Sequence, residues 1–63
     1  MNKFNVGDLV YIPSEVLIFN DTQVFKLPIP VSLLITGQKD THYEVFFENK
    51  SWLVDCKHVY KAR

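Results

Sequence analysis

Apolar residues recur at every second position through much of this chain, and that alternation limits what it can fold into. Val10 and Ile12 fall on one side of an extended segment, with Leu9 and Tyr11 on the other. The segments with this period are 9–12, 16–19, 43–48 and 52–54. No window keeps an apolar stripe at helical spacing long enough for a stable helix. The pattern therefore predicts an all-β fold.

Turn-forming residues divide the chain into short strands, because proline, glycine and asparagine interrupt the apolar segments. We expect strands near 3–13, 15–20, 24–27, 31–37, 42–48, 51–55 and 59–61. The stretch Asp55–His58 is too short for an α-helix and suits one 3₁₀ turn. A flat sheet would leave one apolar face in water, so we expect a strongly bent barrel of five to six short antiparallel strands.

Sixty-three residues suffice for one domain, spanning 1–63. Cys56 is the only cysteine, which predicts a reducing, cytoplasmic compartment without disulfides. Met1 to Lys3 lead directly into the first strand pattern, so we expect no signal peptide. The longest apolar runs are far shorter than the ~20 residues that span a bilayer, and we expect no membrane partner.

The charges balance, with seven basic and seven acidic residues. General nucleic-acid binders usually carry a basic excess, because neutralising phosphates drives their affinity. A DNA mimic would carry an acidic excess instead. Zero net charge with 14% aromatic residues favours protein association, either with a partner or between copies of the chain.

Two segments carry a resemblance. Residues Trp52–Lys61 resemble the end of SH3-like barrels, where a strand runs into a 3₁₀ turn and a last short strand. Residues Phe4–Pro13 resemble the first strand of such barrels, with a Val-Gly-Asp turn before an alternating apolar run. The resemblance implies that residues 15–30 form the long first hairpin. Residues Phe4–Pro13 are also similar to small uncharacterised bacteriophage proteins, which implies a bacterial cytoplasm as the compartment.

Three functional families share the SH3-like architecture, and the chain departs from each. Peptide-binding SH3 domains use paired tryptophans and an Ala-Leu-Tyr-Asp-Tyr-like segment, whereas Trp52 is the only tryptophan. KOW modules resemble the run Gly7–Val10 but need glycines in the following loop, and residues 13–36 contain none. Type II dihydrofolate reductases use a Val-Gln-Ile-Tyr segment, which is lacking near 51–54. An enzyme is therefore not predicted.

Two side-chain pairs have the residue types of catalytic or metal sites. Cys56 lies two residues from His58, but zinc needs three or four protein ligands and His42 is the only further soft candidate. Glu44 and Glu48 fall on one strand face, where carboxylates more often serve solubility than acid–base chemistry. We expect Cys56 to fill core space, and we predict no catalytic residues, metal or cofactor.

The C-terminus offers an alternative function, because its basic residues are interleaved with aromatic ones. Single-stranded nucleic acid binds such surfaces by charge and stacking, with Trp52 as a further candidate ring. The candidate residues are Lys57, Tyr60, Lys61 and Arg63. An ordinary solvated tail explains the same residues, so this interpretation is the less favoured one.

The segment 17–31 holds more apolar side chains than one face of a small barrel can bury, because Val16, Ile18 and Val24 also favour the inside. We expect an outer apolar strip that serves as a protein interface. The alternative is that the hairpin folds over and buries the strip. The predicted contact residues are Leu17, Phe19, Phe25, Leu27, Ile29 and Trp52. The sequence thus favours a non-enzymatic protein-binding module that contacts a host or phage protein, or another copy of itself.

Overall fold

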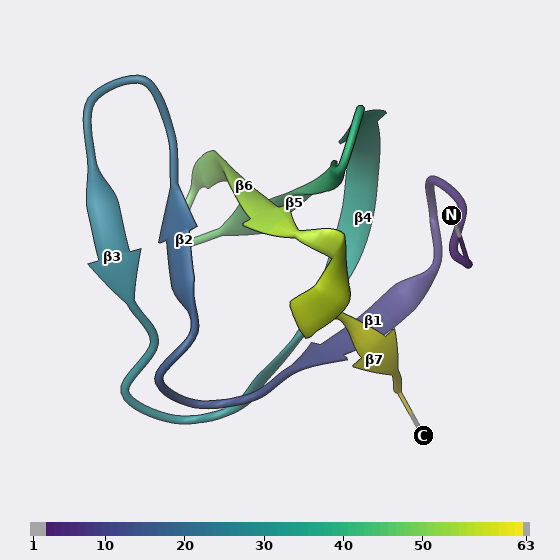
Figure 1. Ribbon diagram of the computed structural model, residues 1–63, viewed down its shortest axis with the longest axis horizontal. Helices are drawn as coiled ribbons and strands as arrows, with labels where there is room; N and C mark the ends of the chain where they lie inside the picture. Colours follow the sequence, from purple (N-terminus) through teal and green to yellow (C-terminus); the bar gives the residue numbers. More distant parts are fainter. Residues whose placement is uncertain (1–2, 63) are drawn as a thin grey trace.

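The computed structural model describes residues 3–62, which form seven β-strands and one 3₁₀ turn (Figure 1). In chain order the elements are β1 (Leu9–Ile12), β2 (Leu17–Phe19), β3 (Val24–Lys26), β4 (Val31–Lys39), β5 (His42–Phe47), β6 (Lys50–Asp55), the 3₁₀ turn η1 (Cys56–His58) and β7 (Tyr60–Lys61). The predicted all-β class and the 3₁₀ turn are confirmed. All seven predicted strand segments are present, so the sheet has more strands than the five to six expected of the barrel.

All seven strands belong to one antiparallel sheet, in the order β3-β2-β6-β5-β4-β1-β7. β3 and β7 form its two edges, and no ladder joins these edges within residues 3–62. The sheet is therefore open, where the sequence led us to expect a barrel. The two edge strands have three and two residues.

Strand β4 changes partner along its length, and this change bends the sheet. Its first part pairs with β1, through Leu34 opposite Leu9, and its second part pairs with β5, starting at Ile35 opposite Val45. The register shifts between Ile35 and Gly37, so one extra residue forms a β-bulge. Bulges increase local twist and bend the strand that carries them. The sheet can therefore wrap around a single core.

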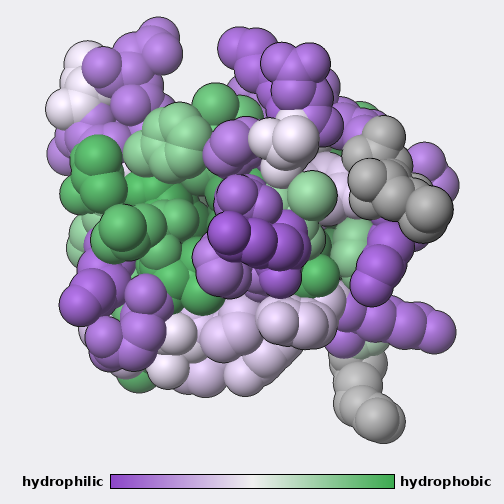
Figure 2. Space-filling view, viewed as in Figure 1, coloured by the Kyte–Doolittle hydropathy of each residue, from purple (hydrophilic) through white to green (hydrophobic). Residues whose placement is uncertain are grey.

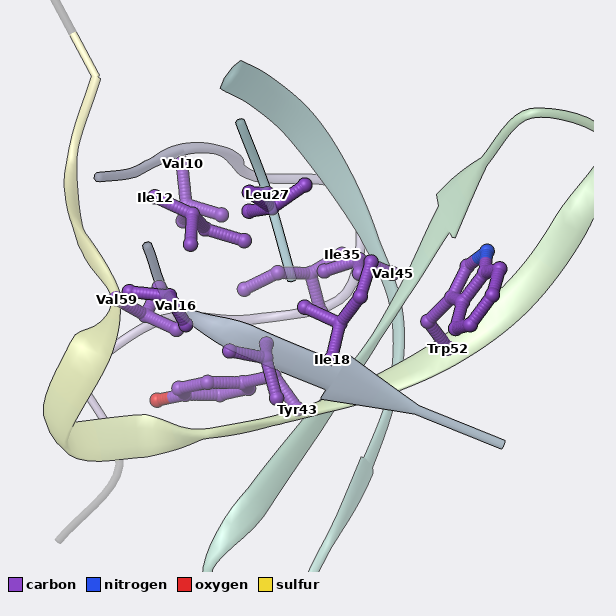
Figure 3. Packing of buried hydrophobic residues seen from close by; sticks show 11 residues of the cluster. Val10, Ile12, Val16, Ile18, Leu27, Ile35, Tyr43, Val45, Trp52 and Val59 are labelled. Atoms are coloured by element: carbon purple, nitrogen blue, oxygen red, sulfur yellow. The ribbon is translucent and has the colours of Figure 1, made fainter. Parts of the chain in front are cut away.

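The core contains one cluster of buried apolar side chains that come from both halves of the sheet (Figure 3). Its members are Val10, Ile12, Val16, Ile18, Leu27, Ile35, Tyr43, Val45, Trp52, Val54 and Val59. In β1, β5 and β6 the buried residues alternate with more exposed ones, as the sequence period predicts. No buried side-chain nitrogen or oxygen in the described chain lacks a hydrogen-bond partner.

Backbone geometry sets two strand ends differently from the prediction. β1 begins at Leu9, not near residue 3, because Gly7 takes φ 96° in a turn where the Asp8 amide donates to Asn5 O at 3.0 Å. Glycine adopts this positive φ without a Cβ clash. β4 continues beyond its predicted end at residue 37 to Lys39, so its turn into β5 is short.

Candidate functional site

The β2–β3 hairpin carries most of the predicted contact residues, and its register decides which way they face. Ile18 lies opposite Phe25, and Phe19 lies opposite Val24. Directly opposed residues share a face of the sheet. Phe25 therefore lies on the core side with Ile18, while Val24 lies on the outer side and is 70% exposed. The expectation that Val24 points inward is wrong.

The turn between β2 and β3 explains this register. The Asn20 amide donates to Gln23 O at 2.9 Å, which closes a four-residue turn. Asn20 Oδ1 accepts hydrogen bonds from the amides of Thr22 and Gln23 at 3.0 and 2.9 Å. A short asparagine side chain stabilises a turn in this way. The turn holds an even number of residues, four, so even-numbered positions pair with odd-numbered ones across it. Even-numbered residues therefore face the core in β2, and odd-numbered residues do so in β3.

Two of the six predicted contact residues lie in the core. Leu27 is fully buried; its amide donates to Val16 O at 3.0 Å, and its carbonyl accepts from Glu15 N at 2.7 Å. Trp52 is also buried, and its indole Nε1 donates to Phe47 O at 2.9 Å. Figure 3 shows Trp52 at one end of the cluster. Neither residue contributes to the outer surface of this fold.

The other four predicted contact residues remain at the surface. Leu17 is 54% exposed, Phe25 and Ile29 are also exposed, and Phe19 is half-buried with its ring edge-to-face on His42. We call the following residues the hairpin surface: Leu17, Phe19, Val24, Phe25 and Ile29. Figure 2 shows apolar atoms gathered over the β2–β3 hairpin. The structure thus leaves apolar side chains exposed near 17–31, with Leu17, Phe19 and Val24 on the outer face and Phe25 at the edge of the core face.

A small cavity lies beside β3 and has aromatic walls. The Phe25 ring centroid is 6.0 Å from that of Phe47 and 6.1 Å from that of Trp52. The cavity has a volume of about 210 Å³, and its lining residues are Gln23, Phe25, Phe47, Glu48, Lys50 and Trp52. Lys50 Nζ donates to Gln23 Oε1 at 2.7 Å across its rim. The Phe25 ring packs against the other two rings, and together they form an aromatic floor to this depression.

The candidate carboxylate pair is separated in the fold. Glu44 lines a larger open groove of about 540 Å³ beside the Asn20–Thr22 turn, whereas Glu48 lies in the β5–β6 turn at the aromatic cavity. Glu44 Oε1 accepts a hydrogen bond from Thr36 Oγ1 at 3.3 Å. The two carboxylates therefore face different hollows.

The residues around Cys56 have structural roles in this fold. Cys56 is half-buried and packs against the core, and its amide donates to Thr41 O at 2.9 Å. Asp55 Oδ1 accepts from the Lys57 amide at 3.0 Å and caps η1. That hydrogen bond lowers the pKa of Asp55, and the nearby charges of Lys57, His42 and His58 act in the same direction. Among residues 3–62, no three histidine, cysteine or acidic side chains group into a metal site.

The C-terminal alternative is described only in part. Lys57, Tyr60 and Lys61 are exposed, and Arg63 lies outside the described residues. Tyr60 lies on β7 directly opposite Tyr11 of β1. The Trp52 ring, which the sequence placed near this group, packs on Phe25 instead.

A second apolar surface, on the outer face of β4, β1 and β7, was not among the predicted sites. Leu9 lies opposite Leu34, and Tyr11 lies opposite Tyr60. We call these four residues the outer β1 surface; each is exposed. The sequence did hold a signal, because the run Leu9–Ile12 is apolar at every position. Strands covered on both faces read as continuous apolar runs.

Comparisons with known proteins give no relatives: no family model, no curated protein sequence and no solved structure matches this chain. Within the described residues, none of the helical structure has the length and apolarity needed to cross a membrane.

Proposed function

We propose that this protein is a non-enzymatic protein-binding module that captures an extended apolar segment of its partner along β3. The supporting observation is that all three residues of this edge strand are exposed, with Val24 at 70%. Two of these three residues, Val24 and Phe25, are apolar, and exposed apolar side chains at a sheet edge favour a covering partner. The hairpin that carries it projects at one side of the molecule (Figure 1).

Strand addition explains how such a segment would be held. An added strand gains main-chain hydrogen bonds from the sheet edge, and its alternate side chains occupy neighbouring pockets. Here the inner side chains would meet the aromatic floor of Phe25 and Phe47, and the outer ones would contact Val24 and Leu17. Lys26 Nζ lies 3.4 Å from Glu15 Oε1 beside this edge. Charges at an edge oppose indiscriminate strand pairing, which favours a specific partner.

The proposal keeps the SH3-like resemblance as the architecture. Support comes from the order of elements, in which a first hairpin precedes a three-strand meander, a 3₁₀ turn and a short last strand. The likeness of residues 4–13 to bacteriophage proteins makes a bacterial protein the first partner to test. Binding would act by occlusion, without a chemical step.

The test is capture of partners from bacterial lysate by the tagged full-length chain, with and without nuclease, read by mass spectrometry. We expect one protein in stoichiometric amount that survives nuclease treatment. Leu17→Lys and Val24→Lys should each abolish its recovery, because both place a charge at the apolar contact. Leu34→Lys is the matched control, since Leu34 is 53% exposed on another surface.

Circular dichroism must show that each variant keeps the β-fold. Recovery that is unchanged by both hairpin variants would contradict the proposal. Recovery that disappears with nuclease would favour the C-terminal residues Lys57, Tyr60 and Lys61 and nucleic acid instead.

A further inference from the structure

The outer β1 surface lies on the opposite arm of the sheet from the hairpin and needs its own explanation. In the sheet order, β2 and β3 stand at one end, and β4, β1 and β7 at the other. Leu9 and Leu34 form one cross-strand row. Tyr11 and Tyr60 form the next row, two residues along β1. All four side chains point away from the core, because Val10 and Ile12 of the same strand point into it.

The surface is uncharged at its centre. Within residues 3–62, the only other side chain that strand pairing places in these rows is Ser32, opposite Tyr11. Phe46 continues the outer face of the sheet on β5, since its neighbour Val45 is buried and pairs with Ile35. None of the described side chains in these rows is charged, so the rows supply no counter-ion to a ligand that is recognised by charge. The chemistry of the surface therefore fits an apolar protein face.

The area fits a small dimer. Each of the four side chains is roughly half exposed, which corresponds to an apolar centre on the order of 400 Å². That is about a tenth of the molecule's surface of 4463 Å². With Phe46, which is 49% exposed on the same outer face, two copies would bury roughly 1,000 Å², near the lower limit for a specific interface. Tyrosine is among the residues that contribute most to binding energy at interfaces.

We infer that the outer β1 surface is the contact of a two-fold homodimer. A two-fold interface brings the same patch of both copies together, so the patch must complement itself. With the axis running across the strands, the leucine row of one copy faces the tyrosine row of its partner. Zero net charge removes long-range repulsion between the copies. Association also stabilises a chain whose size limits its own core.

The dimer would make the protein bivalent, because the hairpin surface stays free on each copy. The inference does not rest on the proposed function: it concerns a different surface and a different occupant. Its failure would leave hairpin binding intact, and the reverse also holds.

The test is the molar mass of the full-length chain in solution, by light scattering and sedimentation, from low micromolar to near-millimolar concentration. We expect the mass to rise from 7.4 kDa towards twice that value, with a dissociation constant in the micromolar range. Leu34→Lys should raise that constant at least about tenfold, which corresponds to about 1.4 kcal/mol. Leu17→Lys is the matched control, because Leu17 and Leu34 have the same residue type and similar exposure. It should leave the dimer unchanged.

Concentration-dependent NMR shifts of the unmodified chain give a second measurement that needs no variant. They should concentrate at Leu9, Tyr11, Leu34 and Tyr60. A monomer across the whole concentration range would overturn the inference. So would a dimer that resists Leu34→Lys while its shifts map to the hairpin.

Discussion

The hydroxyl of Tyr43 accepts a hydrogen bond from the backbone amide of Phe4 at 3.1 Å, while their two rings pack edge-to-face with centroids 6.0 Å apart. The same hydroxyl accepts from the Lys3 amide at 3.0 Å. Tyr43 lies in the core, so these contacts join the N-terminal segment to β5 across about forty residues of sequence. A single phenol oxygen thus satisfies two backbone donors of a segment that lies outside the strands.

Tyr43→Phe should therefore lower the free energy of unfolding by about 1–2 kcal/mol, because two amides lose their acceptor while the ring packing remains. For a domain of this size, each kcal/mol corresponds to a fall in Tm of roughly 4–8 °C. Urea unfolding measures the loss of stability, and hydrogen exchange at the Lys3 and Phe4 amides localises it. Unchanged exchange at both amides would show that the hydroxyl does not hold the segment.

Gly37 and Glu44 are coupled across the β4–β5 ladder. A Cβ atom at Gly37 would lie 2.6 Å from Glu44 Oε1 and 3.3 Å from Glu44 Cβ. Gly37→Ala should therefore displace the Glu44 side chain, break its bond to Thr36 and destabilise the protein by about 1 kcal/mol. In a Glu44→Ala background the same change should cost less, because the 2.6 Å contact with Oε1 is gone and only the 3.3 Å contact with the Cβ of residue 44 remains. A double-mutant cycle by urea unfolding measures both values; equal effects in the two backgrounds would exclude the coupling.

Asp55 should make stability pH-dependent in the acid range. Its pKa is lowered in the folded protein below the ordinary 3.8, so folding favours the carboxylate. The stabilisation is therefore complete above the unfolded pKa and is lost as pH falls through the folded one. Asp55→Asn keeps an oxygen that can cap η1 but removes the titration. We expect the stability difference between the parent and this variant to shrink as pH falls below about 4, as read by thermal unfolding at several pH values.

If that difference stays constant down to the lowest accessible pH, the Asp55 carboxylate does not contribute by its charge. Asp55→Ala serves as the control for capping, because it removes both the charge and the acceptor for the Lys57 amide. It should be less stable than Asp55→Asn at every pH.

The β5–β6 turn is built from two non-glycine residues with positive φ, Glu48 at 53° and Asn49 at 63°. This left-handed conformation costs most residues about 1 kcal/mol, and the sequence Asn-Gly suits it best. The double substitution Glu48→Asn with Asn49→Gly should therefore stabilise the protein by about 1 kcal/mol. Thermal unfolding measures the gain. A lower Tm would indicate that the Glu48 side chain contributes at the aromatic cavity beyond its backbone conformation.

The local pattern of the chain was enough to predict the strand class, most strand positions and the 3₁₀ turn. Strand alternation has a period of two whatever the neighbours are, so Val10 and Ile12 were readable as members of one strand face, and the structure shows that this face is buried. Turn residues such as Asn20 act on their own backbone, and their effect is equally local.

The sequence alone was not enough to predict which side chains of the β2–β3 hairpin face the core and which face outward. Val24 is exposed and Leu27 is buried, which is the reverse of the expectation. A register shift of one residue reverses every side chain of a strand, and the turn at Asn20–Gln23 sets that register. Trp52 and Phe25 form one aromatic cluster only because β6 and β3 flank β2 in the sheet.

The elements of this protein could be predicted from local sequence, since periodicity, turns and strand propensity depend on residues within a few positions of one another. Long-range strand pairing, in contrast, sets the open order of the sheet, the phase of β3 and the joining of Leu34 and Tyr60 to the outer face of β1. Those features depend on pairing between strands far apart in the chain. A local pattern does not encode which of several compatible strands becomes the neighbour, and burial of the shared core makes that choice.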